Sequence, residues 1–173
     1  SYVGVFAKES RAQVLNFGVS GTRIARQKTP SGNPMFDECF KDRAEKMPED
    51  LDVVVVFGGT NDYGHGDAAI GDFSDRTPET FYGACHYLFS GLIRKYLGKT
   101  IVIMTPLHRL GETVIPEVKA NGKYVVLKEY VNIIREVAEY YSLPVLDLFA
   151  VSGLQPEINE IRENYLPDGL HPN

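Results

Sequence analysis

The sequence lacks three things: a long hydrophobic run, abundant cysteine and an excess of basic residues. Because no run of about 18 apolar residues occurs, no transmembrane helix is expected. Lys and Arg number 18 against 23 Asp and Glu, and they are scattered. A nucleic-acid partner would require a basic face, so none is expected. No basic, apolar leader opens the chain, and we expect a cytoplasmic protein.

Cysteine provides neither a disulfide framework nor a metal site. Cys39 and Cys85 are the only two cysteines, and each falls in a segment predicted to be helical. We expect two buried free thiols, with a disulfide as the alternative. No group of Cys and His has the spacing of zinc ligands, so no metal site is predicted.

The hydrophobic pattern predicts one α/β domain over residues 1–173. Hydrophobic residues make up 43% of the chain, enough for an ordinary core. Residues 53–57 and 101–104 are apolar on both faces, which is typical of strands buried between two helical layers. Residues 13–17 and 145–148 are weaker strand candidates.

Amphipathic segments between these strands predict helices. One begins after Asn33, continues through Phe36, Phe40, Ala44 and Met47, and ends at Pro48. A second opens at Thr77 and ends near Gly98, a third covers residues 127–141, and residues 2–9 resemble the remainder of another. The alternation of strand and helix predicts a three-layer α/β/α sandwich with a parallel sheet.

Ligands of such sheets bind beyond the carboxyl ends of the strands. There, residues 58–62 read Gly-Gly-Thr-Asn-Asp. The two glycines permit a sharp turn and a close approach of ligand, and Asn61 presents an amide donor. An ordinary strand-to-loop turn, where Gly and Asn are common, is the alternative.

Two further segments carry candidate chemistry. In residues 168–171, Asp-Gly-Leu-His, the three-residue spacing can set the Asp168 carboxylate against the His171 imidazole, fixing its tautomer and stabilising the imidazolium. A surface turn with an unrelated histidine is the alternative. In residues 16–21, Asn-Phe-Gly-Val-Ser-Gly, Gly21 can offer its N–H to a developing oxyanion; a plain turn is the alternative.

Together, and in this order, the three segments resemble the second, third and last conserved blocks of the SGNH (GDSL-type) hydrolase superfamily. The resemblance spans nearly the whole chain. It implies a flavodoxin-like sandwich and esterase or acylhydrolase chemistry with no metal or cofactor. Carried over residue by residue, it makes His171 the general base, Asp168 its orienting carboxylate, and Asn61 and Gly21 oxyanion-hole donors.

The family's first block, Gly-Asp-Ser after the first strand, has no counterpart here. Ser20 lies nearest to a useful loop, but we expect it to hydrogen-bond within its own turn. We therefore expect that the first strand and its serine precede Ser1, and that the chain is truncated at both ends. The missing strand would lie between the strands at 13–17 and 53–57. A non-catalytic binding protein that lacks the nucleophile is the alternative.

We expect substrate contacts from Thr60, Asp62, His108 and Arg109, which follow strands on the predicted active-site side. Arg109 suits a substrate carboxylate or hydroxyls, and an ion pair with Glu112 is the alternative. The expected partner is a small-molecule ester, with a short-chain acyl group or an O-acetylated carbohydrate; a homo-oligomer is left open. A nucleotide-binding protein is disfavoured because neither glycine turn carries the lysine of a Walker loop.

Overall fold

The structure, a computed structural model, describes residues 2–114 and 125–173. Its centre is a parallel sheet of β1 (Val53–Phe57), β2 (Thr100–Met104) and β3 (Val145–Leu146), in the order β1-β2-β3. The strands predicted at 53–57 and 101–104 are confirmed. The third is shorter than predicted because the Asp147 side chain caps the next helix by accepting from the Ala150 N–H.

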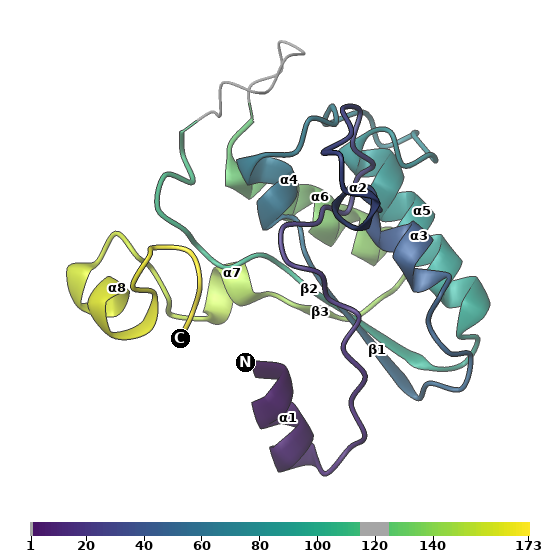
Figure 1. Ribbon diagram of the computed structural model, residues 1–173, viewed down its shortest axis with the longest axis horizontal. Helices are drawn as coiled ribbons and strands as arrows, with labels where there is room; N and C mark the ends of the chain where they lie inside the picture. The colour runs from purple at the N-terminus through teal and green to yellow at the C-terminus, as the bar shows by residue number, and fades with distance from the viewer. Residues whose placement is uncertain (1, 115–124) are drawn as a thin grey trace.

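One face of the sheet is covered by helices, as Figure 1 shows. These are α3 (Phe40–Ala44), α5 (Phe81–Lys95) and α6 (Leu127–Tyr140). Their apolar sides, together with the sheet, form a single core whose fully buried members include Phe81, Leu88, Phe89, Ile103 and Ile134. The expected α/β fold with a parallel sheet is thereby confirmed.

Two predicted helices differ from those observed. The helix expected after Asn33 is broken into α2 (Pro34–Asp37) and α3, with an extended residue at Glu38 between them. The helix expected to open at Thr77 begins at Phe81, because the Thr80 side chain accepts from the Gly83 N–H and caps it there. The helix predicted at residues 127–141 is confirmed as α6.

The other face of the sheet is more open. Val53 and Val55 are 52% and 48% exposed. The helix α1 (Tyr2–Ser10), predicted from the sequence, lies on that side in Figure 1 without covering these valines. The strand predicted at 13–17 was wrong: this segment has no regular structure and does not pair with β1, and its Leu15 is 47% exposed.

Three short helices lie around the carboxyl ends of the strands, at the upper left of the sheet in Figure 1: α4 (Thr60–Gly64), α7 (Leu148–Val151) and α8 (Asn159–Tyr165).

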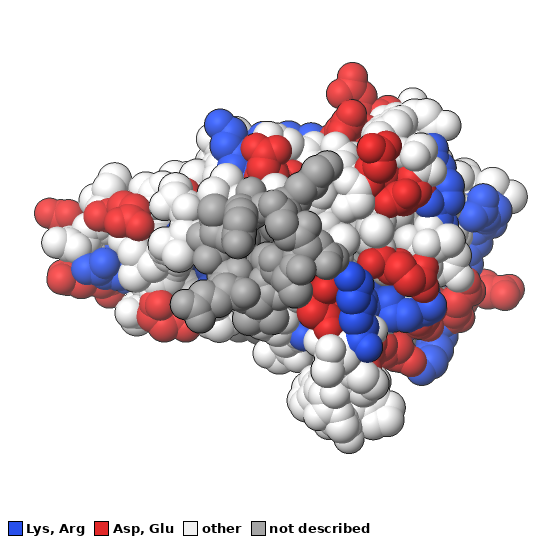
Figure 2. Space-filling model, turned by 90° about the horizontal axis from the view of Figure 1, so that it is seen from above, with Lys and Arg blue, Asp and Glu red and all other residues white. Residues whose placement is uncertain are grey.

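Within the described residues, no helix is long and apolar enough to cross a membrane. Cys39 and Cys85 are buried free thiols, as predicted. On the face seen in Figure 2, acidic and basic side chains are interspersed.

Candidate active site

The C-terminal loop builds a local acid–base pair from Asp168 and His171. The Asp168 Oδ2 atom lies 2.7 Å from His171 Nδ1. Its Oδ1 atom accepts from the His171 N–H at 2.7 Å and the Leu170 N–H at 2.9 Å. The hydrogen bonds from the His171 backbone and ring, and then from Leu170, hold the pKa of Asp168 well below its usual range. With Nδ1 facing an ionised carboxylate, Nε2 is the ring nitrogen suited to proton transfer.

This loop is attached to the segment that follows β2. The Leu110 N–H donates to the Gly169 carbonyl at 2.8 Å. Gly169 is buried and has φ +73°, and a Cβ atom there would lie 2.4 Å from Leu110 Cδ1. Glycine therefore serves both the left-handed backbone and the close approach of the two loops.

The segment after β2 is attached in turn to α4. Arg109 Nη1 donates to the Thr60 hydroxyl at 3.2 Å and to the Thr60 carbonyl at 3.3 Å. Its guanidinium lies 5.5 Å from the centre of the Tyr63 ring. Through Arg109 and Leu110, the loop containing His171 and the helix containing Asn61 are both joined to the loop that leaves the carboxyl end of β2.

Asn61 lies in α4, which is preceded by its N-cap residue Gly59 in a left-handed conformation, φ +106°. The Asn61 Nδ2 atom donates to the Thr22 carbonyl at 3.0 Å. This contact sets Asn61 against the turn that contains Gly21, whose φ is +78°. His65 Nε2 lies 3.0 Å from the Gly21 carbonyl oxygen and adds a second link between α4 and the same turn. The structure thus brings two of the predicted oxyanion donors into one cluster.

Asp62 occupies a different environment from the one expected of a substrate-binding residue. Its side chain is only 3% exposed, and its two oxygens accept from the Ile24 N–H at 3.0 Å and the Ala25 N–H at 2.9 Å. Both carboxylate oxygens therefore already fix the chain that follows the Gly21 turn. This arrangement makes Asp62 a backbone anchor.

His108 and Arg109 share Glu112, but not as the sequence suggested. His108 Nδ1 lies 2.8 Å from Glu112 Oε1, and the Arg109 backbone N–H donates to Glu112 Oε2 at 3.0 Å. Among the described residues, the Arg109 guanidinium forms no ion pair with Glu112. Instead it reaches Thr60, as described above.

Sequence reasoning missed Thr22 and Arg43. The Arg43 Nη2 atom donates to the Thr22 hydroxyl at 2.9 Å, and Thr22 Oγ1 lies 2.7 Å from the Val19 carbonyl. The hydrogen bond that we expected from Ser20 within this turn is absent from the described residues, and Thr22 closes the turn instead. One feature of the sequence could have pointed to this contact. Arg43 is a charged residue that lies three positions after Phe40, on the face of the helix predicted to be buried.

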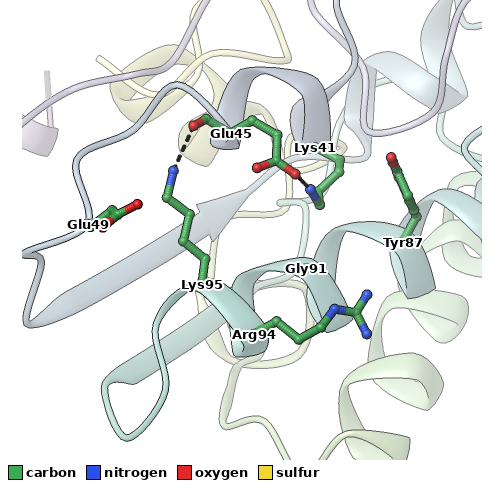
Figure 3. A pocket seen from close by; sticks show the side chains of 7 residues that line it. All are labelled: Lys41, Glu45, Glu49, Tyr87, Gly91, Arg94 and Lys95. Atoms are coloured by element: carbon green, nitrogen blue, oxygen red, sulfur yellow. Dashed lines mark hydrogen bonds and ion pairs between the residues drawn. The ribbon is translucent and has the colours of Figure 1, made fainter.

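A cavity of about 460 Å³ lies elsewhere, between α3 and α5 (Figure 3). Lys41, Arg94 and Lys95 line it, but much of its charge is already used. Lys41 pairs with Glu45, and Lys95 donates to the carbonyls of Ala44, Glu45 and Met47 at the end of α3. Because the ammonium groups of Lys41 and Lys95 already bind protein groups, this cavity is a weaker candidate for a binding site than the strand-end cluster.

Comparison with known proteins shows the family of this chain. The model of the GDSL-like lipase/acylhydrolase family matches residues 1–173. A crystal structure of a Lactobacillus plantarum protein is 28% identical, with a TM-score of 0.85 over 99% of this chain and 79% of that one. Another crystal structure is 33% identical, with a TM-score of 0.84 over 100% of this chain and 78% of that one.

More distant structures share the fold alone. A Bacteroides ovatus protein described as a GDSL-like lipase is 21% identical, with a TM-score of 0.62 over 84% of this chain and 63% of that one. None of the curated proteins matches this sequence. The parallel sheet with its helices and the family match define an α/β fold of the SGNH hydrolase type. The chain belongs to the GDSL-like lipase/acylhydrolase family.

Proposed function

We propose that this protein hydrolyses carboxylic esters of small molecules through a serine acyl-enzyme. The observation that carries the proposal is the 2.7 Å contact between His171 Nδ1 and Asp168 Oδ2 in a chain of this family. The substrates are short-chain acyl esters or O-acetylated carbohydrates. Thr60, His108 and Arg109, which surround the strand ends, contact the part of the substrate away from the scissile bond.

In this mechanism, His171 Nε2 takes the proton of a serine hydroxyl as the serine oxygen attacks the ester carbonyl carbon. The Gly21 N–H and the Asn61 amide donate to the resulting oxyanion. Collapse of the tetrahedral intermediate breaks the bond to the alcohol, which leaves with the proton from His171. Water then repeats the sequence on the acyl-enzyme and releases the acid.

The nucleophile of this proposal is the serine of a Gly-Asp-Ser sequence, which does not occur in residues 1–173. Among the described residues, no serine forms a hydrogen bond with His171. Ser20 is exposed in the turn before Gly21, and no Gly-Asp-Ser sequence occurs. The experiments below therefore use protein expressed from its whole coding sequence.

The acid–base pair can be tested with His171→Ala and Asp168→Asn, assayed on p-nitrophenyl acetate and butyrate. We expect His171→Ala to remove nearly all turnover. Asp168→Asn should lower kcat by about 10³–10⁴ because the ring tautomer is no longer fixed. Glu163→Gln, an exposed carboxylate on neighbouring α8, is the matched control and should keep wild-type turnover. Wild-type turnover in His171→Ala would exclude His171 as the general base, whereas a wild-type protein without turnover would favour a binding protein.

A further inference from the structure

Arg43 is a buried charge in an unusual position. It belongs to α3, is 9% exposed and stacks on Phe40, with its guanidinium 4.9 Å from the ring centre. Burial lowers the pKa of Arg43, but arginine remains protonated at neutral pH. Within the described part of the chain it forms no ion pair, and its Nη1 atom is buried without a hydrogen-bond partner. Such a charge is costly to bury, so its single side-chain hydrogen bond requires explanation.

That hydrogen bond ends on Thr22, which links the two candidate oxyanion donors. Thr22 is 3% exposed. Its hydroxyl accepts from Arg43 Nη2 at 2.9 Å, which leaves the hydroxyl proton to donate to the Val19 carbonyl at 2.7 Å. Its backbone N–H donates to the same carbonyl at 3.3 Å and closes the turn around Gly21. Its own carbonyl accepts from Asn61 at 3.0 Å.

We propose that Arg43 is a positioning residue that acts through Thr22 to hold the Gly21 N–H and the Asn61 amide in one geometry. This inference rests on the proposed esterase function. Arg43 lies 21 residues after Thr22, and among the described residues it forms no hydrogen bond with Gly21 or Asn61. By accepting from Arg43, the Thr22 hydroxyl is oriented to donate to Val19, and the turn and the Asn61 contact are fixed together. Preorganised donors stabilise an oxyanion without reorganising during the reaction, and a displacement of about 1 Å can cost about 10²-fold in rate.

The test compares Arg43→Met and Thr22→Val with Thr22→Ser. Met keeps the apolar stem on Phe40 but removes the donor; Val keeps the shape of Thr without its hydroxyl; Ser keeps the hydroxyl. Activity on p-nitrophenyl acetate is expressed per active site titrated with a fluorophosphonate, so that unfolded molecules do not count. We expect kcat to fall about 10- to 100-fold in the first two variants, with KM within about threefold. Thr22→Ser should stay within about threefold of wild type.

The double variant Thr22→Val/Arg43→Met separates this role from general stabilisation. If Arg43 acts through Thr22, the double variant loses no more kcat than Thr22→Val alone, within about threefold. Arg94→Met, which removes an exposed guanidinium that donates to Ser90, is the control and should match wild type.

Three results would overturn the inference. Wild-type kcat in Thr22→Val would show that the Thr22 hydroxyl is not needed, and losses that multiply in the double variant would show that Arg43 acts by another route. Both leave the esterase proposal standing. A wild-type protein that hydrolyses no ester would instead overturn the proposed function, and the positioning role with it. If Arg43→Met does not fold, the comparison of Thr22→Val with Thr22→Ser decides alone.

Discussion

Asn61 has two amide N–H bonds, and the structure uses one to reach the Thr22 carbonyl. That contact orients the amide, so the same side chain can meet an oxyanion without first losing rotational freedom. A donor of this kind stabilises charge that exists only in the transition state. Its removal should therefore affect turnover more than substrate binding.

We expect Asn61→Ala to lower kcat on p-nitrophenyl acetate by about 10²–10³ while KM changes little. Asn164→Ala is the matched control, because that exposed asparagine on α8 also donates its amide to a backbone carbonyl, that of Glu160, at 2.8 Å. Steady-state kinetics of both variants provide the measurement. Unchanged turnover in Asn61→Ala would mean that its amide serves only the fold.

Single residues differ in how far the sequence could reveal them. The contact between Asp168 and His171 was predictable because both residues belong to one four-residue turn. The contacts of Asp62 were not predictable because its partners, the N–H groups of Ile24 and Ala25, lie 38 and 37 residues away. Arg43 was missed for the same reason: its contact with Thr22 depends on how α3 packs, which no local pattern encodes.

At the scale of elements, the loop that carries His171 depends on its approach to the segment after β2. Gly169 and Gly98 have nearly the same φ, +73° and +74°, but different surroundings. A Cβ atom at Gly169 would meet the Leu110 side chain at 2.4 Å, whereas one at Gly98 meets nothing within 4 Å. Alanine variants of the two glycines therefore distinguish the effect of backbone strain from the effect of the close contact between loops.

We expect Gly169→Ala to lower kcat at least tenfold, because the alanine must push the loop that holds Asp168 and His171 away from Leu110. Gly98→Ala also places an alanine at a positive φ, so it should lose about 1 kcal/mol of stability from backbone strain and keep wild-type kcat. Thermal unfolding and kinetics, measured in parallel, check both. Equal kcat in the two variants would show that the contact with Leu110 does not position the catalytic pair.

The central elements were predictable, and their boundaries were less so. The strands at 53–57 and 101–104 and the helix α6 have apolar patterns strong enough to identify them. The start of α5 was misplaced because Thr77-Pro78 has the composition of a helix start, yet the chain there is still in a loop. The Phe81 N–H donates across that loop to the Ala69 carbonyl at 2.8 Å. Such long-range contacts decide where a helix begins.

At the scale of the whole molecule, the open edge of the sheet and the proposed active site both bear on the location of the nucleophilic serine. β1 pairs with β2 on one side, and within the described residues no strand lies on its other side. The strand ends hold the proposed base, its carboxylate and the two proposed oxyanion donors, but among the described residues no serine forms a hydrogen bond with His171. A hydrolase of this kind requires that nucleophile.

A fluorophosphonate reacts with an activated serine and marks it covalently, so the nucleophile can be located by mass spectrometry of the labelled protein. In protein expressed from its whole coding sequence, we expect the label on a serine of a Gly-Asp-Ser sequence and on none of the serines in residues 1–173. His171→Ala should abolish labelling, because the serine then has no base to accept its proton, and Glu163→Gln should leave it unchanged. Label on Ser20 would place the nucleophile in the turn beside Gly21 and overturn the expectation of a separate serine. A protein that takes no label, while its fold is intact by circular dichroism, would favour a non-catalytic binding protein built on the same sheet.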